Sequence, residues 1–412
     1  MRILHLHGRY TPFGGAETYL KDVYQAQREK GHDVTVVYAS LFPSNYSPQP
    51  REFFITPSTG IKAGFKTKKQ SLHLIREIAP DIIHLHVVHY DISPYILRMI
   101  IGIWPTVYTV HDLLWLCLKS PDIHRVCTLC AKQIYFRAML RYSTLKTIPY
   151  NLVRLWTLYE LKQTSTFLVH SEGVKQVIIQ NGFSSDRIEV LRPYLPLPDT
   201  WMTNPLLRGV GGRADPPLRE AGGCAEPNNV ILFVGKLASH KGIFDLVKAV
   251  SRIHNVTWKL VIIGDGGRKD DVRELLLDKG LLEKSAVRGR IPRKKLGEYY
   301  RNASVVVVPS RCPETFGFVG PEAMFFGKPV VAYDSGIQNE WLIDGKTGYL
   351  VRCGDIASLS EKIQLLLTDK DLATKLGENG RKRCSMFLNK QGHINKLIEI
   401  YERSIQLYRL NS

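Results

Sequence analysis

The sequence predicts an α/β fold with two domains, each built around a parallel sheet. Short apolar, β-branched runs alternate with helical patterns through both halves of the chain, and glycine-containing loops follow many of these runs. A chain of 412 residues has room for two or three domains, and 44% hydrophobic with 23% charged residues is ordinary globular usage. This composition excludes a disordered chain, a collagen-like repeat and a coiled-coil rod.

The first half begins with a β-loop-α-β unit. An apolar run at residues 2–7 leads into a glycine-containing loop, a helical pattern follows at 16–30, and Val34, Val36 and Val37 mark the next strand. Further expected elements are a helix at 69–79 and strands at 81–86, 105–110 and 167–169. We assign residues 1–198 to this first domain.

A second series of strands and helices follows a stretch of different composition. Residues 199–229 are rich in Gly, Pro and Ala without periodicity, which predicts an interdomain linker and a surface loop. The second domain is expected at 230–388, followed by a C-terminal helix at 389–412 that could cross back to the first domain. Its expected strands are 230–234, 258–263, 286–288, 304–308, 329–332 and 348–351, with helices at 243–253, 270–279, 294–302, 321–326, 356–367 and 372–384. Ligands bind at the carboxyl ends of such strands, so we expect the active site in a cleft between the domains.

Charge is the outlier of the composition. Lys and Arg number 56 and Asp and Glu 38, which gives a net charge of +18 spread over both halves. Such a diffuse positive field attracts nucleotides, phosphorylated substrates, anionic lipid surfaces or nucleic acid. No long basic tail stands out in the sequence, so nucleic acid is not expected as a partner.

Cysteine usage and hydropathy indicate a reducing compartment. Seven cysteines form an odd, sparse set that is unlike a disulfide framework. The N-terminal residues are too polar for a secretory signal, and no run of about 18 apolar residues predicts a membrane-spanning helix. We therefore expect a cytoplasmic protein, which could lie on the inner face of the membrane.

The strongest chemical signal is the string PSRCPETFGFVGPEAM at residues 309–324. Glu314 lies in a loop between a strand and a helix, and Glu322 lies at the start of that helix. Backbone N–H groups at a helix start bind anions, and carboxylates accept hydrogen bonds from hydroxyl groups. For Glu322 alone, the alternative is an acid that stabilises the helix dipole.

This string resembles the paired-glutamate motif of the retaining GT-B glycosyltransferases of family 4, also called glycosyl transferases group 1. The resemblance covers nearly the whole chain and implies two Rossmann-like domains that face a central cleft. It further implies that Glu314 contacts the transferred sugar and that Glu322 binds the ribose of the nucleotide. The backbone around Phe316, Gly317 and Val319 would then line the pocket for the sugar and the diphosphate.

Two glycine-containing loops resemble the family at the corresponding places. The loop GKLASHKG at 235–242 implies that Lys236 and Lys241 clamp the diphosphate of the donor. The family usually has Arg at the first position, and Lys keeps its charge but loses the bidentate fork. Gly14 and Gly15 match the family's glycine turn, which implies that Gly15 lets the backbone approach the donor closely.

Two strand ends in the first domain also resemble the family. They read PDIIHLH at 80–86 and YTVHD at 108–112. The second implies that His111 faces the reacting sugar and, with Glu314, is catalytic, whereas Asp112 orients backbone or acceptor. We expect a structural role for four other histidines, His5, His7, His89 and His170.

The resemblance implies sugar transfer with retention of configuration, from a UDP- or GDP-linked donor to a glycan or lipid-linked acceptor hydroxyl. Such transfer passes through an oxocarbenium-like transition state, and the lysines can stabilise the departing diphosphate. The resemblance to a GT-B site also implies a metal-independent reaction, so no metal or other cofactor is expected to be required. The biological setting would be the assembly of a polysaccharide or another glycoconjugate.

Two further features allow more than one interpretation. Cys117, His124, Cys127 and Cys130 could hold a structural zinc ion or remain reduced thiols in a loop. The insert at 132–162 carries six basic residues, one acid and six aromatics. It is expected to be helical, and it could lie on an anionic membrane, pack on the core with a solvated basic face, or bind nucleic acid.

Other classes of protein remain as alternatives. A nucleotide-sugar epimerase shares the two-domain architecture but would turn over its donor without an acceptor. A non-catalytic protein that binds membrane or nucleic acid would tolerate the loss of Glu314 and Lys241. A dehydrogenase fits poorly, because the GDG at residues 264–266 lacks the third glycine of a dinucleotide loop.

Overall fold

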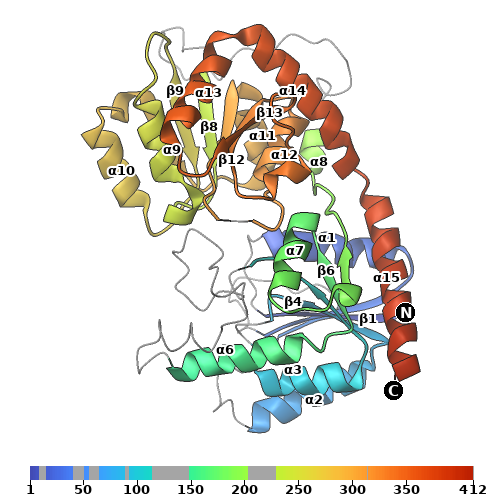
Figure 1. Ribbon diagram of the computed structural model, residues 1–412. Coiled ribbons are helices and arrows are strands. Elements are labelled where there is room, and N and C mark those ends of the chain that lie inside the picture. Colours follow the sequence, from blue (N-terminus) through green and yellow to red (C-terminus); the bar gives the residue numbers. More distant parts are fainter. Residues whose placement is uncertain are drawn as a thin grey trace. The chain divides into compact units, whose positions relative to one another are not determined.

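Two parallel sheets organise the chain, one in each of two units (Figure 1). The computed structural model describes residues 1–8, 15–39, 51–54, 65–88, 92–113, 148–202, 229–312 and 314–411. Unit 1 consists of Met1–Pro196 and Lys390–Ser412, and unit 2 of Leu197–Asn389. The chain therefore passes between the units twice, after Pro196 and after Asn389.

Unit 1 has a seven-stranded sheet in the order β3-β2-β1-β4-β5-β6-β7, with all neighbours parallel. Its strands are β1 (Arg2–His7), β2 (Asp33–Tyr38), β3 (Glu52–Phe54), β4 (Ile82–His86), β5 (Thr106–Thr109), β6 (Thr166–Val169) and β7 (Ile188–Val190). The central strands are buried along nearly their whole length, and in β1 and β4 histidines alternate with apolar residues. The strand order reverses direction between β1 and β4.

The helices of unit 1 cover both faces of this sheet. They are α1 (Gly15–Glu29), α2 (Phe65–Ile78), α3 (Pro94–Ile103), α6 (Ile148–Leu161), α7 (Glu172–Gln180), the short η2 (Ser185–Arg187) and α15 (Lys390–Asn411). The hydroxyl of Ser93 accepts the Ile96 N–H at the start of α3, and that of Ser171 accepts the Val174 N–H at the start of α7. In Figure 1, α2, α3 and α6 lie on the face of the sheet opposite to α1.

The C-terminal helix α15 belongs to unit 1. Its buried side chains Ile394, Leu397, Ile400 and Tyr401 share a core with residues of α1 and of the sheet, such as Tyr19. Residues from the two ends of the chain therefore form one core, and the helix expected at 389–412 begins at Lys390.

Unit 2 has a six-stranded parallel sheet in the order β10-β9-β8-β11-β12-β13. The strands are β8 (Val230–Val234), β9 (Lys259–Ile263), β10 (Ser285–Gly289), β11 (Val305–Val308), β12 (Val330–Asp334) and β13 (Gly348–Arg352). The strand order reverses between β8 and β11. Open α/β sheets bind ligands at such switch points, at the carboxyl ends of the strands.

The helices of unit 2 follow the strands in alternation. They are α8 (Asp199–Met202), α9 (Ile243–Val250), α10 (Lys269–Asp278), α11 (Arg293–Asn302), α12 (Val319–Phe325), α13 (Ile356–Thr368) and α14 (Lys370–Cys384), with the short turns η4 (Ser239–Lys241), η5 (Leu282–Lys284), η6 (Gln338–Glu340) and η7 (Ser385–Phe387). Asp355 and Asp369 cap α13 and α14 by accepting backbone N–H groups through their carboxylates.

The expected linker differs from the structure at its start. Residues 199–202 form α8, and Trp201 is 1% exposed and packs edge-on against Tyr300 and Phe326 of unit 2. The large indole buries apolar surface, so this part of the linker is a structural element of unit 2. Residues 203–228 lie outside the described residues.

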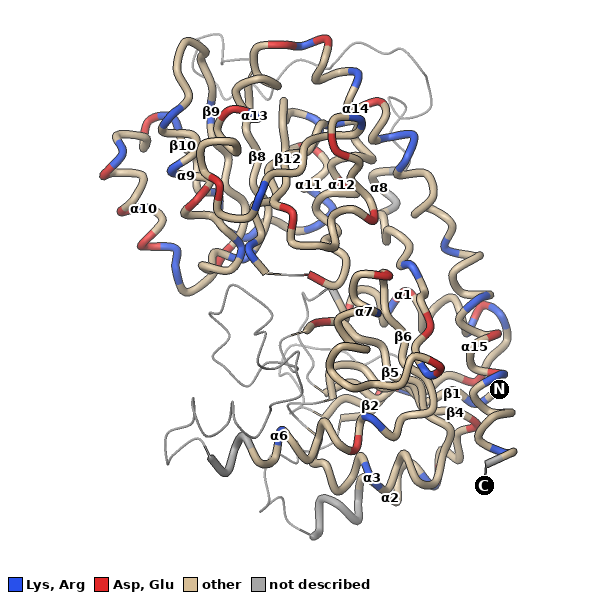
Figure 2. The backbone as a smooth tube through the Cα atoms, viewed as in Figure 1, with Lys and Arg blue, Asp and Glu red and all other residues tan. Residues whose placement is uncertain are grey.

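Charged residues of both signs are spread over both units, as the sequence predicts. Lys and Arg alternate with Asp and Glu over the elements of both units, as on α10 (Figure 2). Within the described ranges, no helix combines the length and the apolar character needed to cross a membrane.

Candidate active site

The switch point of unit 2 brings two loops together, one after β8 and one after β11. Lys241, at the end of the first loop, donates a hydrogen bond from Nζ to Oε1 of Glu314 in the second, at 2.8 Å. The hydroxyl of Ser310 donates to the same carboxylate oxygen. The side chains of Lys241 and Glu314 are 27% and 22% exposed. The structure thus joins two of the residues expected to bind the donor.

Glycine makes the close approach of these loops possible. Gly242 has φ of 71°, and a Cβ there would lie 1.8 Å from the carbonyl oxygen of Pro309. Arg311 adds a second link between the loops, because its guanidinium donates two hydrogen bonds to Asp245 of α9, at 2.6 and 2.7 Å. Its backbone N–H donates to the carbonyl of His240 at 2.9 Å. This bidentate pair was not expected from the sequence.

The environment of Glu314 keeps its carboxyl group ionised. Burial raises the pKa of Glu314, but the charge of Lys241 and the hydrogen bonds from Lys241 and Ser310 outweigh burial, so the net shift of the pKa is downward. An ionised carboxylate accepts hydrogen bonds and donates none. It therefore suits a ligand that presents hydroxyl groups.

Glu322 lies in the first turn of α12 and is almost completely buried. Its Oε1 pairs with the guanidinium of Arg293, and its Oε2 accepts the phenol proton of Tyr300 at 2.7 Å. Burial raises the pKa of this carboxyl group, and the contacts with Arg293 and Tyr300 oppose that rise. A ribose at Glu322 would share the carboxylate with both of these residues. Arg293 was missed at the sequence level, where nothing sets it apart from neighbouring Lys294 and Lys295.

The segment between the two glutamates is held by Trp341. The indole Nε1–H of Trp341 donates to the carbonyl of Phe316 at 2.8 Å, and the ring of Phe316 is buried. Gly317 has φ of 78°, and a Cβ at Gly320 would lie 2.2 Å from the Trp341 ring. Val319 begins α12. The expected pocket residues therefore lie on a fixed segment beside Glu314.

The remaining expected donor residues are in different surroundings. Lys236 is exposed on the loop after β8. Gly15 begins α1 in unit 1, whereas Gly14 lies outside the described residues. Cys117, His124, Cys127 and Cys130 also lie outside the described residues, as does most of the 132–162 insert. Only the final part of that insert, within α6, is described.

His111 follows β5 at the carboxyl edge of the unit 1 sheet, close to the switch point between β1 and β4. Its Nε2 lies 2.9 Å from Nδ1 of His86, the last residue of β4. His86 in turn contacts His5 of β1, so the expected catalytic histidine is one of a group. The grouping follows from strand register, since His5 is directly opposite His84 and both point to one face of the sheet.

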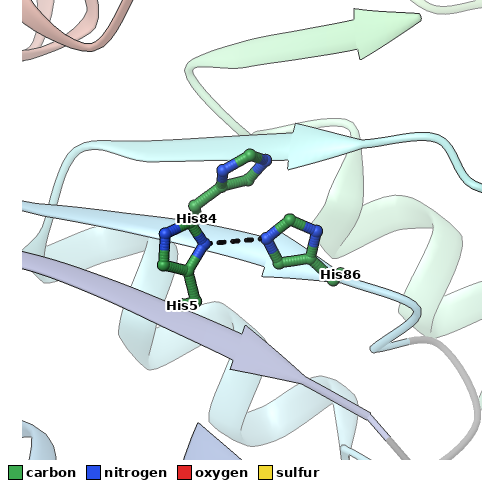
Figure 3. A group of neighbouring side chains, drawn as sticks. All are labelled: His5, His84 and His86. Carbon is green, nitrogen blue, oxygen red and sulfur yellow. Dashed lines mark hydrogen bonds between the residues drawn. The ribbon is translucent and has the colours of Figure 1, made fainter. Parts of the chain in front are cut away.

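Three of these histidines have the spacing of a metal site. The donor atoms of His5, His84 and His86 all lie within 4.8 Å of one another (Figure 3). All six of their ring nitrogens, however, are hydrogen-bonded to protein groups: to each other, Gln27, Tyr401, Thr109 and His111. The rings therefore satisfy each other and their neighbours without a metal ion.

Two Rossmann-like units, with acidic and basic side chains at the switch point of the second, place the protein in the two-domain parallel α/β class. Comparison with known proteins identifies the family. The model of the family described as Glycosyltransferase Family 4 matches residues 13–194, and that described as Glycosyl transferases group 1 matches residues 215–383. The chain belongs to these glycosyltransferases, and its fold is GT-B.

Individual relatives agree with this assignment. A D-inositol 3-phosphate glycosyltransferase of Xylanimonas cellulosilytica is 32% identical over 222 residues, which are 52% of this chain and 51% of that protein. The capsular polysaccharide biosynthesis glycosyltransferase CapM of Staphylococcus aureus is 32% identical over 165 residues, 38% of this chain and 41% of that protein. The chain thus spans about half the length of the curated relatives that it matches. The solved structure of Anabaena HepE in complex with UDP has a TM-score of 0.68 at 21% identity, over 98% of this chain and 100% of that one.

Proposed function

We propose that this protein transfers a sugar from a nucleoside-diphosphate sugar to a hydroxyl group of an acceptor. The observation that carries the proposal is the contact between Lys241 and the ionised Glu314 at the switch point of unit 2. A diphosphate needs a cation, and a sugar needs a hydrogen-bond acceptor for its hydroxyl groups. The pair supplies both within one site.

The same residues suggest how the reaction proceeds. The bond from the sugar to the diphosphate breaks through an oxocarbenium-like transition state, and negative charge develops on the leaving diphosphate. Lys241 and the exposed Lys236 stabilise that charge, so we propose that no metal ion is required. Glu314 holds the transferred sugar, and His111 of unit 1 is the second catalytic residue. The acceptor hydroxyl attacks the sugar from the face that the diphosphate leaves and passes its proton to the departing diphosphate, with retention of configuration.

The donor and the acceptor are also part of the proposal. We propose a UDP-linked sugar as donor, with GDP as the alternative, and the complex of HepE with UDP supports testing UDP first. CapM acts in capsular polysaccharide biosynthesis, which supports a glycan or a lipid-linked glycan as acceptor. The product would then be a polysaccharide or another glycoconjugate.

We further propose that unit 1 contacts an anionic membrane surface through α6, the described end of the basic insert. Leu152, Trp156 and Tyr159 are 48%, 39% and 62% exposed, and their spacing places them along one side of the helix. Exposed apolar and aromatic side chains near basic residues suit the interface of anionic lipids. A lipid-linked acceptor would be reached from this surface.

Thermal stabilisation by UDP, GDP, ADP, their sugar conjugates and NAD tests the donor site. A ligand at about 100 times its Kd adds roughly 2.7 kcal/mol of stability, a readily measured shift in Tm. We expect one nucleoside diphosphate class to stabilise the wild type, and Lys241→Ala to abolish the shift. Lys248→Ala, an exposed site on α9, should keep it. A wild type that no nucleotide stabilises, or a full shift in Lys241→Ala, would overturn the proposed donor site.

Flotation with vesicles that contain anionic lipid tests the membrane contact. We expect the wild type to float with the vesicles and the double variant Trp156→Ala, Tyr159→Ala to remain in solution. Leu277→Ala removes a side chain of unit 2 that is 65% exposed and should float as the wild type does. Wild-type protein that stays in solution would rule this contact out.

A further inference from the structure

One face of the unit 1 sheet carries a polar layer between the strands and the helices that cover them. His5 of β1 and His84 and His86 of β4 point to this face (Figure 3). All three are completely buried. Buried polar groups need hydrogen-bond partners, and here the partners come from α1, α15 and β5.

A chain of hydrogen bonds leads from α1 to His111, and we call Gln27, His5, His86 and His111 the histidine chain. Oε1 of Gln27 lies 2.8 Å from Nε2 of His5. Nδ1 of His5 lies 3.0 Å from Nε2 of His86, and Nδ1 of His86 lies 2.9 Å from Nε2 of His111. Every link joins one ring nitrogen to the next residue.

A second branch leaves the other end of the same amide. Nε2 of Gln27 donates to the hydroxyl of Tyr401 in α15 at 3.3 Å. That hydroxyl lies 2.5 Å from Nδ1 of His84, and Nε2 of His84 lies 2.6 Å from the hydroxyl of Thr109. Gln27 is itself completely buried, so both ends of its amide depend on these partners.

The rules of donors and acceptors give both branches a direction. An amide oxygen only accepts and an amide nitrogen only donates, whereas a neutral imidazole donates from one nitrogen and accepts at the other. Because Oε1 of Gln27 faces His5, the proton of His5 is on Nε2, and its Nδ1 must accept from His86. His86 then has its own proton on Nε2, and its Nδ1 accepts from Nε2–H of His111. The Tyr401 branch runs consistently, with its hydroxyl donating to Nδ1 of His84.

This assignment requires neutral rings, and burial supplies that condition. Burial lowers the pKa of His5 to about 4 and lowers the pKa of His84 and His86 well below 6.5, with neighbouring histidines adding to the shift of the last two. Near neutral pH, His5, His84 and His86 therefore each have one donor and one acceptor. A proton added to any of these three rings would set two donors against each other.

We propose that Gln27 is a positioning residue that fixes the tautomer of His111 through His5 and His86. In its neutral form, His111 then donates its Nε2 proton to His86 and keeps a lone pair on Nδ1. Any hydrogen bond that Nδ1 of the neutral ring makes, it makes as an acceptor. Resting on the proposed function, this predicts that His111 receives a hydrogen bond from a hydroxyl of the sugar or acceptor and does not bind phosphate.

Nuclear magnetic resonance on nucleotide-free protein with ¹⁵N-labelled histidine tests this directly. Long-range proton–nitrogen correlations show which nitrogen of each ring carries the proton, and the His111 signal is identified by its loss in His111→Gln. We expect the Nε2–H tautomer at His111, His86 and His5. An Nδ1–H tautomer at His111 would overturn the proposal, and it is also the result expected if the Gln27 amide has the opposite orientation.

Substitutions at Gln27 test the cause. Gln27→Leu removes the amide, and we expect His111 to become a mixture of both tautomers. Gln27→Glu keeps an acceptor for Nε2–H of His5 and should keep the wild-type tautomer. Gln25→Leu, two residues earlier on the exposed side of α1, is the control and should change nothing. A pure Nε2–H tautomer of His111 in Gln27→Leu would overturn the role of Gln27.

The tautomer experiment can contradict the role of Gln27 without contradicting the proposed function, and the donor experiment can do the reverse. The resonance measurement contains no nucleotide, so it stands even if the protein is not a sugar transferase. If transfer is established, an equal mixture of tautomers in Gln27→Leu halves the competent fraction, and the KM of the substrate whose hydroxyl bonds to His111 should rise about twofold. An unchanged KM for both substrates beside a mixed tautomer would show that the tautomer of His111 does not matter for transfer.

Discussion

Tyr300, in α11, donates its phenol proton to Oε2 of Glu322, in α12, at 2.7 Å inside unit 2. Both residues are buried, and this hydrogen bond opposes the rise that burial causes in the pKa of Glu322. Tyr300→Phe should therefore lower the free energy of unfolding by about 2 kcal/mol, as for other hydrogen bonds to charged groups. Urea unfolding measures this loss. Tyr299→Phe, at the half-buried neighbouring position, is the control, and an equal loss in both variants would contradict the prediction.

The carboxylate of Glu314 should matter for transfer far more than for stability. Glu314→Gln keeps the size of the side chain but removes the charge that faces Lys241. We expect kcat/KM for sugar transfer to fall by about 10²-fold or more, the scale seen when one polar contact to a transition state is lost. The Tm should change little, because the pair is partly exposed. Glu361→Gln, at an exposed glutamate of α13, should leave both quantities unchanged, and similar kinetics of the two variants would refute the role of Glu314.

Gly242 should not tolerate a side chain, because its φ is positive and because a Cβ would contact the backbone. Substitutions at two other glycines separate these two causes. Gly242→Ala creates a Cβ 1.8 Å from a carbonyl oxygen at φ of 71°, and we expect a loss of about 3 kcal/mol or more in unfolding free energy. Gly280 has φ of 64° but open space, so Gly280→Ala should cost only about 1–2 kcal/mol. Gly267 has open space and no positive φ, and Gly267→Ala should stay within about 0.5 kcal/mol of the wild type. Equal losses at all three glycines would mean that steric contact is not the cause.

Stability should fall in acid because of the buried histidines. Burial lowers the pKa of His5, His170 and His393 to about 4 each. The unfolded chain takes up these protons near pH 6.5 and the native protein only near pH 4. Their contribution is therefore complete above pH 6.5 and declines as the pH falls toward 4, by about 1.4 kcal/mol per pH unit for each group.

Denaturant unfolding between pH 8 and pH 4 checks this decline. His170→Gln should give a shallower dependence on pH than the wild type, and comparison at pH 8 separates this effect from any general loss of stability. A wild-type stability that is constant from pH 7 to pH 5 would contradict the prediction.

The last helix should stabilise unit 1 rather than unit 2. Leu397 of α15 is 0% exposed within the unit 1 core, so Leu397→Ala should cost about 2–5 kcal/mol. Hydrogen exchange resolved by peptide should show the loss of protection in β1, β2 and α1. Leu407→Ala, at a position that is 53% exposed, should stay near the wild type. Loss of protection in the unit 2 strands alone would contradict the prediction, because it would mean that the helix stabilises unit 2.

The parts of the fold that the sequence predicts are those with long patterns. Strands such as β9 and β11 are nearly continuous apolar runs because they are buried on both faces, and such runs are visible in the sequence. The edge strands β3 and β7 have three residues each, which is too short for a periodic signal, and neither was expected. Trp201 was missed for another reason. It is buried in unit 2, but it lies at the start of a stretch whose composition indicates a linker.

Site residues were predictable where they belong to a sequence motif. They were not predictable where strand pairing or packing brings together residues that are far apart in the sequence. Glu314, Glu322 and Lys241 lie in strings that resemble a family, and Lys241 and Glu314 do meet in space. Arg293 reaches Glu322 across 29 positions, and no local pattern marks it among neighbouring cations. His5 was expected to be structural, as a lone histidine usually is, and its neighbours in the histidine chain come from other strands and helices. Only the pairing of β1 with β4 brings His5 to His86.

Unit 1 is discontinuous in sequence and unit 2 is continuous. This difference affects the order in which the two units can fold during translation. The core of unit 1 needs Ile394, Leu397 and Ile400, which are translated after every residue of unit 2. Domains usually fold in the order of their synthesis. Here unit 1 is translated first, but its core is complete only when α15 has been translated. The apolar face of unit 1 that α15 covers must therefore be protected from aggregation while unit 2 is translated.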